Sequence, residues 1–470
     1  MSKSTEIRSD LMEKFDVLVI GSGSGMIIVA GAVGAGLKTA LVEHGQIGGT
    51  CLNRGCVPSK ILIHPADVTT AIREAEKIGI RATVDSIDFE NIFGRMHKVV
   101  TEDVERQTRA IEMDQKVVWF KSLAEFTSDY TLRTGDQQVT AEKIFIVSGA
   151  RPAIPPLKGI EKIDYLTSDT VLSITSLPKS LVIIGGGYIA AEYGHFFASL
   201  GTEVTIIQRY AGLIPEEEPE VSQLLTEEMG KRMKILTNFD AIEVKRNGFA
   251  KTVVARSTFD DQTKEISGEE LLVASGRIPN SDLLRPEKTG VELDKRGYIK
   301  VDEYLETRKK NIFAFGDAIG RQMFKHVANY EAQVAWHNAI HDHKVKADYT
   351  AAPHAIFTHP QVASVGLKQN EAVRAGYKIL VGRAFYKDTA QGAAMAEPKG
   401  FVKVIVERKT GQILGAHIIG PYASMLIQEI INAMSIGDRS FLPIIRGLHI
   451  HPAMNEVVQN AFGNLQEPSR

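Results

Sequence analysis

An α/β fold is predicted by two copies of one local pattern and by a third strand that ends in a carboxylate. In each copy an apolar strand leads into a glycine-rich turn, a helix and a second strand. The copies comprise strand 16–20, turn 21–26 and strand 39–42, and then strand 181–184, turn 185–190 and strand 203–207. Strands joined in this way form parallel sheets with helices on their faces.

The first turn, from Gly21 to Met26, has the spacing of a Rossmann-like dinucleotide-binding turn. Gly21 and Gly23 allow a tight turn and the close approach of a pyrophosphate to the helix N-terminus. Glu43, at the end of the second strand, is suited to ribose hydroxyls. Met26 replaces the usual small third residue, so we expect the first helix to pack differently. For this copy alone, a turn without a ligand is the alternative.

The second copy has the small third residue, Ala190, after Gly185 and Gly187. Two such units imply two dinucleotides. The second strand ends in Gln208 and Arg209, where a site for NAD usually has an acid. Arg209 suits a 2′-phosphate, or it points into solvent.

Segment Thr307–Asp317 is predicted to be the third strand, ending in Gly316 and Asp317. A carboxylate at the C-terminal end of such a strand lies where ligands of open α/β sheets gather. An ordinary turn residue is the alternative for Asp317.

Both cysteines of the 470-residue chain, Cys51 and Cys56, lie in segment 50–60, which is predicted to be a loop running into a helix. A disulfide across so short a loop removes little entropy from the unfolded chain. Two buried hydrophobic thiols are the alternative. A redox-active dithiol fits better, because a helix N-terminus and the nearby Arg54 and Lys60 favour a thiolate. The dithiol lies between two dinucleotide units in the sequence, which suggests an electron relay.

The composition, 44% apolar and 24% charged, is that of a soluble globular enzyme. A net charge of −2 provides no basic surface for nucleic acid. No apolar stretch approaches the roughly 18 residues of a membrane span, and Met1–Lys14 lacks a signal peptide's apolar core. We therefore expect a cytoplasmic protein, where a close cysteine pair is catalytic more often than structural. His341 and His343 are predicted to be solvated, and no metal site is predicted.

The chain resembles the FAD-dependent pyridine nucleotide-disulfide oxidoreductases from about Phe15 to Gln466. Four motifs occur in the family's order and spacing: GGTCLNRGCVPSK, GGGYIAAEYG, FAFGDAIG and HIHPAMNEVV. The resemblance implies two Rossmann-like dinucleotide-binding domains and a C-terminal α+β dimerisation domain. The implied segments are 1–150 for FAD, 151–276 for NAD(P), 277–349 for the central part of the FAD domain, and 350–470 for dimerisation, with turn-rich stretches at the boundaries.

By this resemblance the cofactors are FAD and NAD, with NADP as the alternative. Glu43 would hold the adenosine ribose of FAD, Gly21 and Gly23 its pyrophosphate, and Asp317 its ribityl chain. Tyr188 would gate the nicotinamide pocket, with a buried core tyrosine as the alternative. Further cofactor contacts are implied at Gly49, Thr50, Lys60, Gly149, Gly185, Gly187, Ala190, Gln208, Arg209, Gly276 and His326.

The resemblance also assigns roles in the reaction. Cys56 would be the thiolate next to the flavin, and Cys51 the thiol that reacts with the substrate. Lys60 would approach the flavin and pair with Glu192, stabilising negative charge on the reduced flavin.

His451, followed by proline, is predicted to be the base that the dithiol needs, because a thiol must lose its proton before it attacks sulfur. Glu456, five residues later, can accept a hydrogen bond from the imidazole and set its tautomer. The resemblance implies that this pair serves Cys51 of a second subunit, so that the enzyme is a homodimer.

No second dithiol is present near the C-terminus, so the substrate must reach Cys51 directly. Dihydrolipoamide dehydrogenase activity, with a lipoyl-bearing partner, is favoured because His449 and His451 resemble that group's histidine pattern. The alternative is an NADPH-dependent reductase of a small disulfide, similar to mycothione reductase, and Gln208–Arg209 favours it. A non-catalytic dimer with a structural flavin is a third hypothesis.

Overall fold

The computed structural model describes residues 12–468 and contains both predicted strand–turn–helix–strand units. Residues 1–11 of the polar N-terminal segment lie outside this description. The chain forms two units. The first comprises Met1–Ser59, Gly94–Ala153 and Arg277–Ala347, and the second comprises Lys60–Phe93, Ile154–Gly276 and Asp348–Arg470. The finer division into four domains stays a prediction.

A mixed sheet with the strand order β3-β2-β1-β6-β5-β4, and with β16 beside β6, forms the centre of the first unit. β1 has parallel neighbours on both sides, so residues 17–20 are buried, which explains their uninterrupted apolar run. The elements are β1 Glu13–Ile20, α1 Gly25–Gly34, β2 Thr39–Val42, α2 Gly49–Asn53, β3 Val117–Phe120, β4 Ala124–Ser128, β5 Thr131–Thr134, β6 Gln137–Ile146, α7 Ser281–Leu284, β16 Ile312–Ala314 and α8 Lys325–Ile340. Helices α3 Cys56–Glu74 and α4 Phe89–Met113 each have residues in both units.

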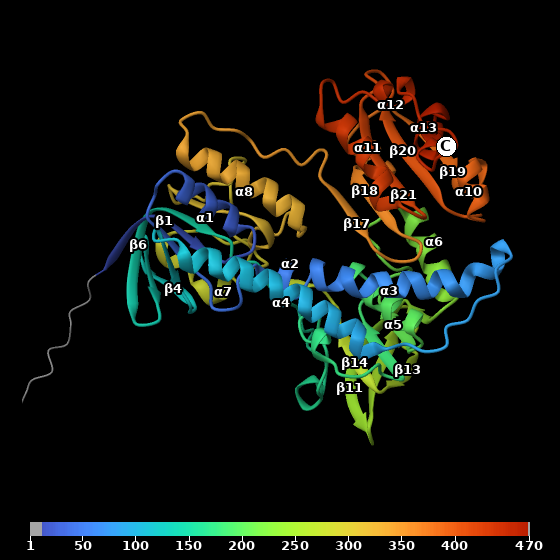
Figure 1. Cartoon of the computed structure of the whole chain (residues 1–470), viewed down its shortest axis with the longest axis horizontal. Helices are drawn as coiled ribbons and strands as arrows, with labels where there is room; N and C mark the ends of the chain where they lie inside the picture. Colours follow the sequence, from blue (N-terminus) through green and yellow to red (C-terminus); the bar gives the residue numbers. More distant parts are fainter. Residues whose placement is uncertain (1–11, 469–470) are drawn as a thin grey trace, which may run out of the picture. The chain divides into compact units, whose positions relative to one another are not determined.

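Close packing of α1 depends on glycines. A Cβ on Gly25 would lie 2.8 Å from Cγ1 of Val19, and a Cβ on Gly31 would lie 2.7 Å from the Trp336 ring of α8. Helices α1 and α8 therefore run side by side (Figure 1). The expected displacement of α1 by Met26 is not needed, because Gly25 supplies the close contact with β1 and Met26 packs, partly buried, at the edge of the core.

Two sequence predictions need correction in this unit. The third strand is shorter than predicted: β16 begins at Ile312, because Asn311 has a left-handed backbone with φ of 61°. Cys51 does not lie in a loop but in the short helix α2, and α3 begins at Cys56 after Arg54 leaves helical geometry. The segment that leaves this unit at Ala153 and the segment that re-enters it at Arg277 pair with each other as β7 Ala150–Pro152 and β15 Arg277–Pro279.

The second unit contains a parallel sheet of order β10-β9-β8-β14, an antiparallel sheet β11-β12-β13, and a C-terminal antiparallel sheet of order β17-β18-β21-β20-β19. Helix α11 packs on β18 and β21. The elements are β8 Ser180–Ile184, α5 Tyr188–Leu200, β9 Glu203–Gln208, α6 Pro219–Gly230, β10 Lys234–Thr237, β11 Phe239–Asn247, β12 Ala250–Ser257, β13 Thr263–Gly268, β14 Glu270–Val273, β17 Pro353–Ile356, β18 Val362–Gly366, α9 Gln369–Arg374, β19 Ile379–Phe385, α10 Ala390–Ala394, β20 Phe401–Glu407, β21 Ile413–Ile419, α11 Ala423–Ser435, α12 Leu442–Arg446 and α13 Glu456–Gly463.

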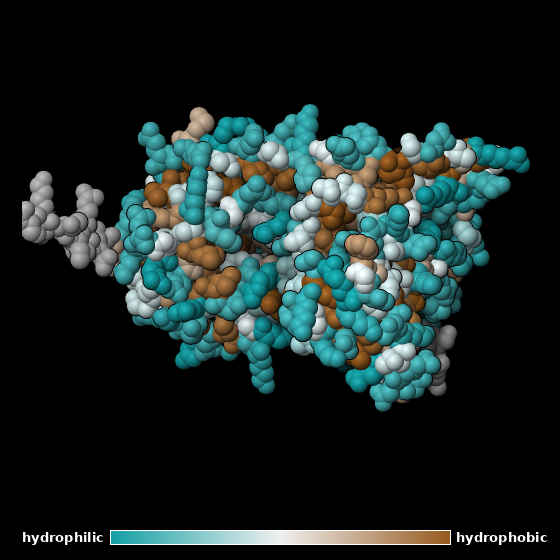
Figure 2. Space-filling view, turned by 90° about the horizontal axis from the view of Figure 1, so that it is seen from below, coloured by the Kyte–Doolittle hydropathy of each residue, from teal (hydrophilic) through white to brown (hydrophobic). Residues whose placement is uncertain are grey.

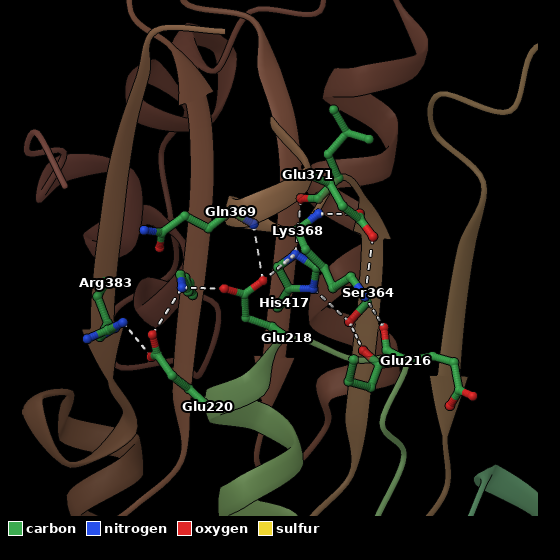
Figure 3. Close-up of polar contacts among 12 residues, drawn as sticks. Glu216, Glu218, Glu220, Ser364, Lys368, Gln369, Glu371, Arg383 and His417 are labelled. Atoms are coloured by element: carbon green, nitrogen blue, oxygen red, sulfur yellow. Dashed lines mark hydrogen bonds and ion pairs between the residues drawn. The ribbon is translucent and has the colours of Figure 1, made fainter. Parts of the chain in front are cut away.

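A buried ionic network joins the start of α6 to the C-terminal sheet (Figure 3). Lys403 of β20 is 1% exposed and donates to Glu218 and, at 3.0 Å, to Glu220. His417 of β21 lies with its Nδ1 3.0 Å from the Ser364 hydroxyl, which donates to Glu217 at 2.5 Å. Charges as deeply buried as these are tolerated only when they are paired, so this network links the two parts of the unit specifically.

Hydrophilic side chains cover most of the face shown in Figure 2, with apolar residues between them. A group of exposed apolar side chains belongs to the C-terminal part of the second unit: Met425, Ile436, Leu448 and Ile450. Among residues 12–468 no helix is both long and apolar enough to cross a membrane.

Candidate active site

The first glycine turn joins β1 to α1 and contacts the helix of the dithiol. Gly21 has a φ of +107°, and a Cβ there would lie 2.2 Å from the Val147 carbonyl oxygen, so only glycine fits. A Cβ on Gly49 would lie 2.6 Å from Cα of Gly23. Glu43, at the end of β2, accepts hydrogen bonds from the backbone and the hydroxyl of Ser22 at 3.0 and 2.9 Å. The turn, its acid and the helix that carries Cys51 therefore form one cluster.

The remaining side of this cluster comes from the segment after β16. Asp317 lies in the 3-10 helix Gly316–Ala318, and its burial raises its pKa, although Arg277, with Nε 3.5 Å from a carboxylate oxygen, acts in the opposite direction. The hydroxyl of Ser148 is buried and has no hydrogen-bond partner in the described structure, and next to it Gly149 faces open space. His326, in the first turn of α8, is exposed and stacks on Phe324.

These residues fit a bound FAD. Close glycine turns accommodate a pyrophosphate, and a buried carboxylate and an unpartnered hydroxyl suit a ligand rich in hydroxyl groups. The particular contacts assigned from the sequence, including those of Thr50 and His326, stay predictions.

Cys51 and Cys56 are not joined by a disulfide in the described structure, and Cys51 is partly buried whereas Cys56 is exposed. The pKa of Cys51 is raised, first by the hydrogen bond that it shares with Cys56 and then by burial. Cys51 therefore holds its proton more tightly than an ordinary cysteine thiol does. The charge of Lys325, from α8, opposes this rise in the pKa of Cys51. Sequence reasoning missed Lys325, because its relation to the dithiol depends on the tertiary structure.

Lys60 follows Cys56 on the next turn of α3 and forms the expected ion pair with Glu192. Its Nζ donates to both carboxylate oxygens, at 2.9 and 2.7 Å. Glu192 is 8% exposed and also accepts from the backbone N–H of Phe357 at 3.0 Å. Lys60 lies 4.7 Å from the centre of the Phe357 ring. These contacts fix the positions of the Lys60 ammonium and the Glu192 carboxylate. That the pair stabilises charge on a reduced flavin stays a prediction.

The second glycine turn lies between β8 and α5. Gly185 has a φ of +113°, and a Cβ there would lie 2.3 Å from the Ala274 carbonyl oxygen. At Gly187, where α5 begins, and at Gly276 an added Cβ would meet only open space. Tyr188 is the first residue of α5 and is partly buried, and Ala190 is buried. This geometry leaves room for a dinucleotide at the helix N-terminus.

The end of β9 carries the residues expected to choose between the nicotinamide cofactors. Gln208 is buried, and its amide donates to the Gly212 carbonyl at 3.2 Å. Arg209 is about half exposed, and its Nη2 lies 3.0 Å from a carboxylate oxygen of Asp240 in β11. The structure thus gives Arg209 a counter-ion that the sequence did not reveal.

His451 and Glu456 lie close together, as predicted. Nδ1 of His451 is 2.8 Å from Oε1 of Glu456, whose other oxygen accepts from the Ala453 N–H at 3.1 Å. The His451 hydrogen bond, followed by that N–H, lowers the pKa of Glu456. His451 is 74% exposed, so its second nitrogen can serve a group outside this chain.

His449 lies differently from His451. Its side chain is 6% exposed, with Nε2 2.6 Å from Glu429 and Nδ1 3.2 Å from the Gly447 carbonyl oxygen. His341 and His343 are exposed, as predicted. The part of the chain that the structure describes contains no group of histidine, cysteine and acidic residues that could hold a metal ion.

Family models match almost the whole chain. The model "Pyridine nucleotide-disulphide oxidoreductase" matches residues 15–341, and the dimerisation-domain model of the same name matches residues 352–462. Mycothione reductase of Mycobacterium tuberculosis is 38% identical over 97% of this chain and 100% of the relative. Dihydrolipoyl dehydrogenase of Chlamydia pneumoniae is 35% identical over 95% and 96%, respectively.

A solved structure has the same fold. The HOCl-induced flavoprotein disulfide reductase RclA from Escherichia coli superposes with a TM-score of 0.84, at 26% sequence identity, over 95% of this chain and 99% of that chain.

Proposed function

Because the chain belongs to the pyridine nucleotide-disulphide oxidoreductase family, we propose that it is an NADPH-dependent reductase of a low-molecular-weight disulfide. The observation that carries the proposal is the full-length similarity to mycothione reductase. The Gln208–Arg209 end of β9 supports it, because Arg209 offers a cation for a 2′-phosphate at the position where an NAD site usually has an acid. In the described structure this cation is paired with Asp240 of β11.

The residues divide the work as follows. Gly21, Gly23, Glu43 and Asp317 would hold FAD, which would supply electron transfer between the nicotinamide and the dithiol. Cys51 attacks the substrate disulfide, and Cys56 then attacks Cys51 to release the second product thiol and re-form the internal disulfide. Lys60, held by Glu192, would stabilise negative charge on the reduced flavin. His451, oriented by Glu456, removes and returns the thiol protons.

Dihydrolipoamide oxidation with NAD+ is the second candidate, and it was favoured by the sequence alone. That preference relied on the histidine pair 449 and 451, on the dithiol loop, and on this activity being the commoner one in the family. The contact of His449 with Glu429 gives this residue a structural role that needs no lipoyl substrate. The similarity to dihydrolipoyl dehydrogenase keeps the activity as a candidate.

Initial rates distinguish the two candidates. The holoenzyme is assayed with NADPH and NADH against a panel of small disulfides, and separately with dihydrolipoamide and NAD+ or NADP+. Rapid NADPH oxidation by one of the disulfides, with dihydrolipoamide poor, supports the proposal. Fast dihydrolipoamide oxidation with NAD+ rejects it in favour of the second candidate.

Cys51→Ser is the control for both assays. It should retain FAD and lose turnover, because a single remaining thiol cannot re-form the internal disulfide and release the second product thiol. Turnover at the wild-type rate would show that the activity measured does not use the dithiol.

A further inference from the structure

The first unit holds a partly buried lysine next to the dithiol. Lys325 is the first residue of α8, and its Nζ donates to the Ser24 hydroxyl at 3.2 Å although the two residues are 301 positions apart. Ser24 is 4% exposed and in turn donates to Asn329, one turn later in α8, at 2.9 Å. The backbone of Lys325 is therefore held by α8, and its ammonium group is held by Ser24 of the first glycine turn.

The anchor brings the ammonium group to the dithiol helix. Ser24 follows Gly23, and Gly23 packs directly against Gly49, the first residue of α2. Cys51 is two residues later in the same short helix. The electrostatic interactions agree with this proximity. The charges of Cys51 and Cys56 raise the pKa of Lys325, and the charge of Lys325 lowers the pKa of Cys51.

The charge balance of Lys325 is unusual. Burial lowers its pKa, and the two sulfurs raise it, so a negative sulfur favours the ammonium form. Among residues 12–468 its polar contact is the neutral Ser24 hydroxyl, and no carboxylate forms an ion pair with it. A partly buried cation that no described carboxylate neutralises is suited to a nearby anion. Two such anions are at hand, the pyrophosphate predicted at the first glycine turn and a thiolate of the dithiol.

The reaction produces such an anion. Reduction of the Cys51–Cys56 disulfide by two electrons, with uptake of one proton, leaves one thiol and one thiolate. The sequence suggested Arg54 and Lys60 for this task. Lys60 is engaged by Glu192, and Arg54 is exposed at the end of α2. We propose that the Lys325 ammonium is the cation that stabilises the thiolate of the reduced Cys51–Cys56 pair.

In this proposal Lys325 stabilises the negative charge on sulfur and takes no part in substrate recognition. The inference rests on the redox role of the dithiol given above, but it does not depend on which disulfide is the substrate. Its test therefore measures thiolate formation directly, and a failed substrate assay leaves that test intact.

The experiment titrates the thiolate in the two-electron-reduced holoenzyme. The rate of alkylation by iodoacetamide is measured across pH, with the modified cysteine identified by peptide mass, and the long-wavelength thiolate-to-flavin absorbance is recorded in parallel. The titratable groups that act on one another here are Cys51, Cys56 and Lys325.

Lys325→Met should raise the midpoint of thiolate formation by about one pH unit or more, which lowers the thiolate fraction below the midpoint about tenfold. Lys325→Arg should restore most of the wild-type behaviour, because it keeps the charge. Lys310→Met, at an exposed lysine of the same unit, should leave the titration unchanged.

Two results would overturn the proposal: a midpoint in Lys325→Met within about 0.3 unit of the wild-type value, or no recovery with arginine. The visible spectrum reports whether each variant holds FAD. If the methionine variant does not, Lys325→Gln, which keeps a hydrogen-bond donor for Ser24 without the charge, is judged by the same two criteria.

Discussion

At the scale of single residues, His451 and Glu456 form a contact that suits the proposed proton transfer. The imidazole is oriented by a carboxylate 2.8 Å away and is otherwise exposed. We expect His451→Gln to lower turnover by about two to four orders of magnitude, which is the usual contribution of a positioned base. His343→Gln, at another exposed histidine, is the matched control. Steady-state rates that fall less than about threefold would remove His451 from the proton transfer.

Arg209 and Asp240 offer a second test at this scale. An exposed ion pair is worth up to about 1 kcal/mol, so its removal alters binding by at most about fivefold. We expect Asp240→Asn to free the guanidinium and to raise kcat/KM for NADPH relative to NADH by about two- to fivefold.

Arg209→Gln should lower kcat/KM for NADPH relative to NADH. When both substitutions are combined, Asp240→Asn should not change this ratio further. These values are measured with one disulfide substrate at saturating concentration. An unchanged ratio in Asp240→Asn would mean that Arg209 does not contact the 2′-phosphate.

At the scale of secondary-structure elements, the buried network couples α6 to β18, β20 and β21. Burial lowers the pKa of His417, and the charges of Glu218 and Glu217 only partly offset this. Burial would raise the pKa of Glu217, but the hydrogen bond and charge of His354, together with the Ser364 hydroxyl, lower it. The folded state thus holds a neutral histidine and an ionised carboxylate.

The sign of the pH dependence follows from these directions. A histidine whose pKa is lowered by folding contributes stability that is present above its unfolded pKa of about 6.5 and is lost as pH falls below that value. Glu217 acts in the same sense below its unfolded value of 4.5. His417→Gln should therefore flatten the fall in the free energy of unfolding between about pH 6.5 and 5, by up to about 1.4 kcal/mol per pH unit.

Urea unfolding at a series of pH values measures this slope. His64→Gln, at an exposed histidine of α3, is the control and should keep the wild-type slope. A His417→Gln protein whose stability falls with acid as steeply as the wild type would show that this histidine does not titrate with unfolding.

At the scale of the whole molecule, the chain contains a dimerisation domain, and exposed apolar residues lie within it. Leu448 is fully exposed and Ile450 is 76% exposed, in the segment just before His451. We expect Leu448→Glu to shift the sedimentation of the protein toward a monomer and to reduce turnover in parallel, because burying a charge in an apolar interface is costly.

Phe249 provides the matched control for this prediction. It is 97% exposed in the connection of β11 and β12, outside the dimerisation domain. Phe249→Glu should leave both sedimentation and turnover unchanged. A dimer that persists in Leu448→Glu, with full activity, would remove this segment from the interface.

Much of the fold could be predicted because its signals are local. Strands β1, β2, β8 and β9 begin or end within three residues of their predicted bounds, since short apolar runs and glycine turns are properties of short segments. β16 was predicted too long, because the left-handed Asn311 interrupts an apparently regular stretch. The effect of Met26 on the first helix stays a prediction, and the neighbouring Gly25 supplies a close contact with β1 that the motif alone did not reveal.

The sequence by itself determined the α/β class, the two glycine turns, the cysteine pair, and the pairing of His451 with Glu456, because each depends on residues a few positions apart. Only the tertiary structure decided which distant charges meet: Lys325 with the dithiol, Asp240 with Arg209, and Lys403 with Glu218. Spacing along the chain carries no information about such pairs. They exist because packing of helices and sheets brings the segments together, and because a buried charge is stable only where that packing supplies a partner.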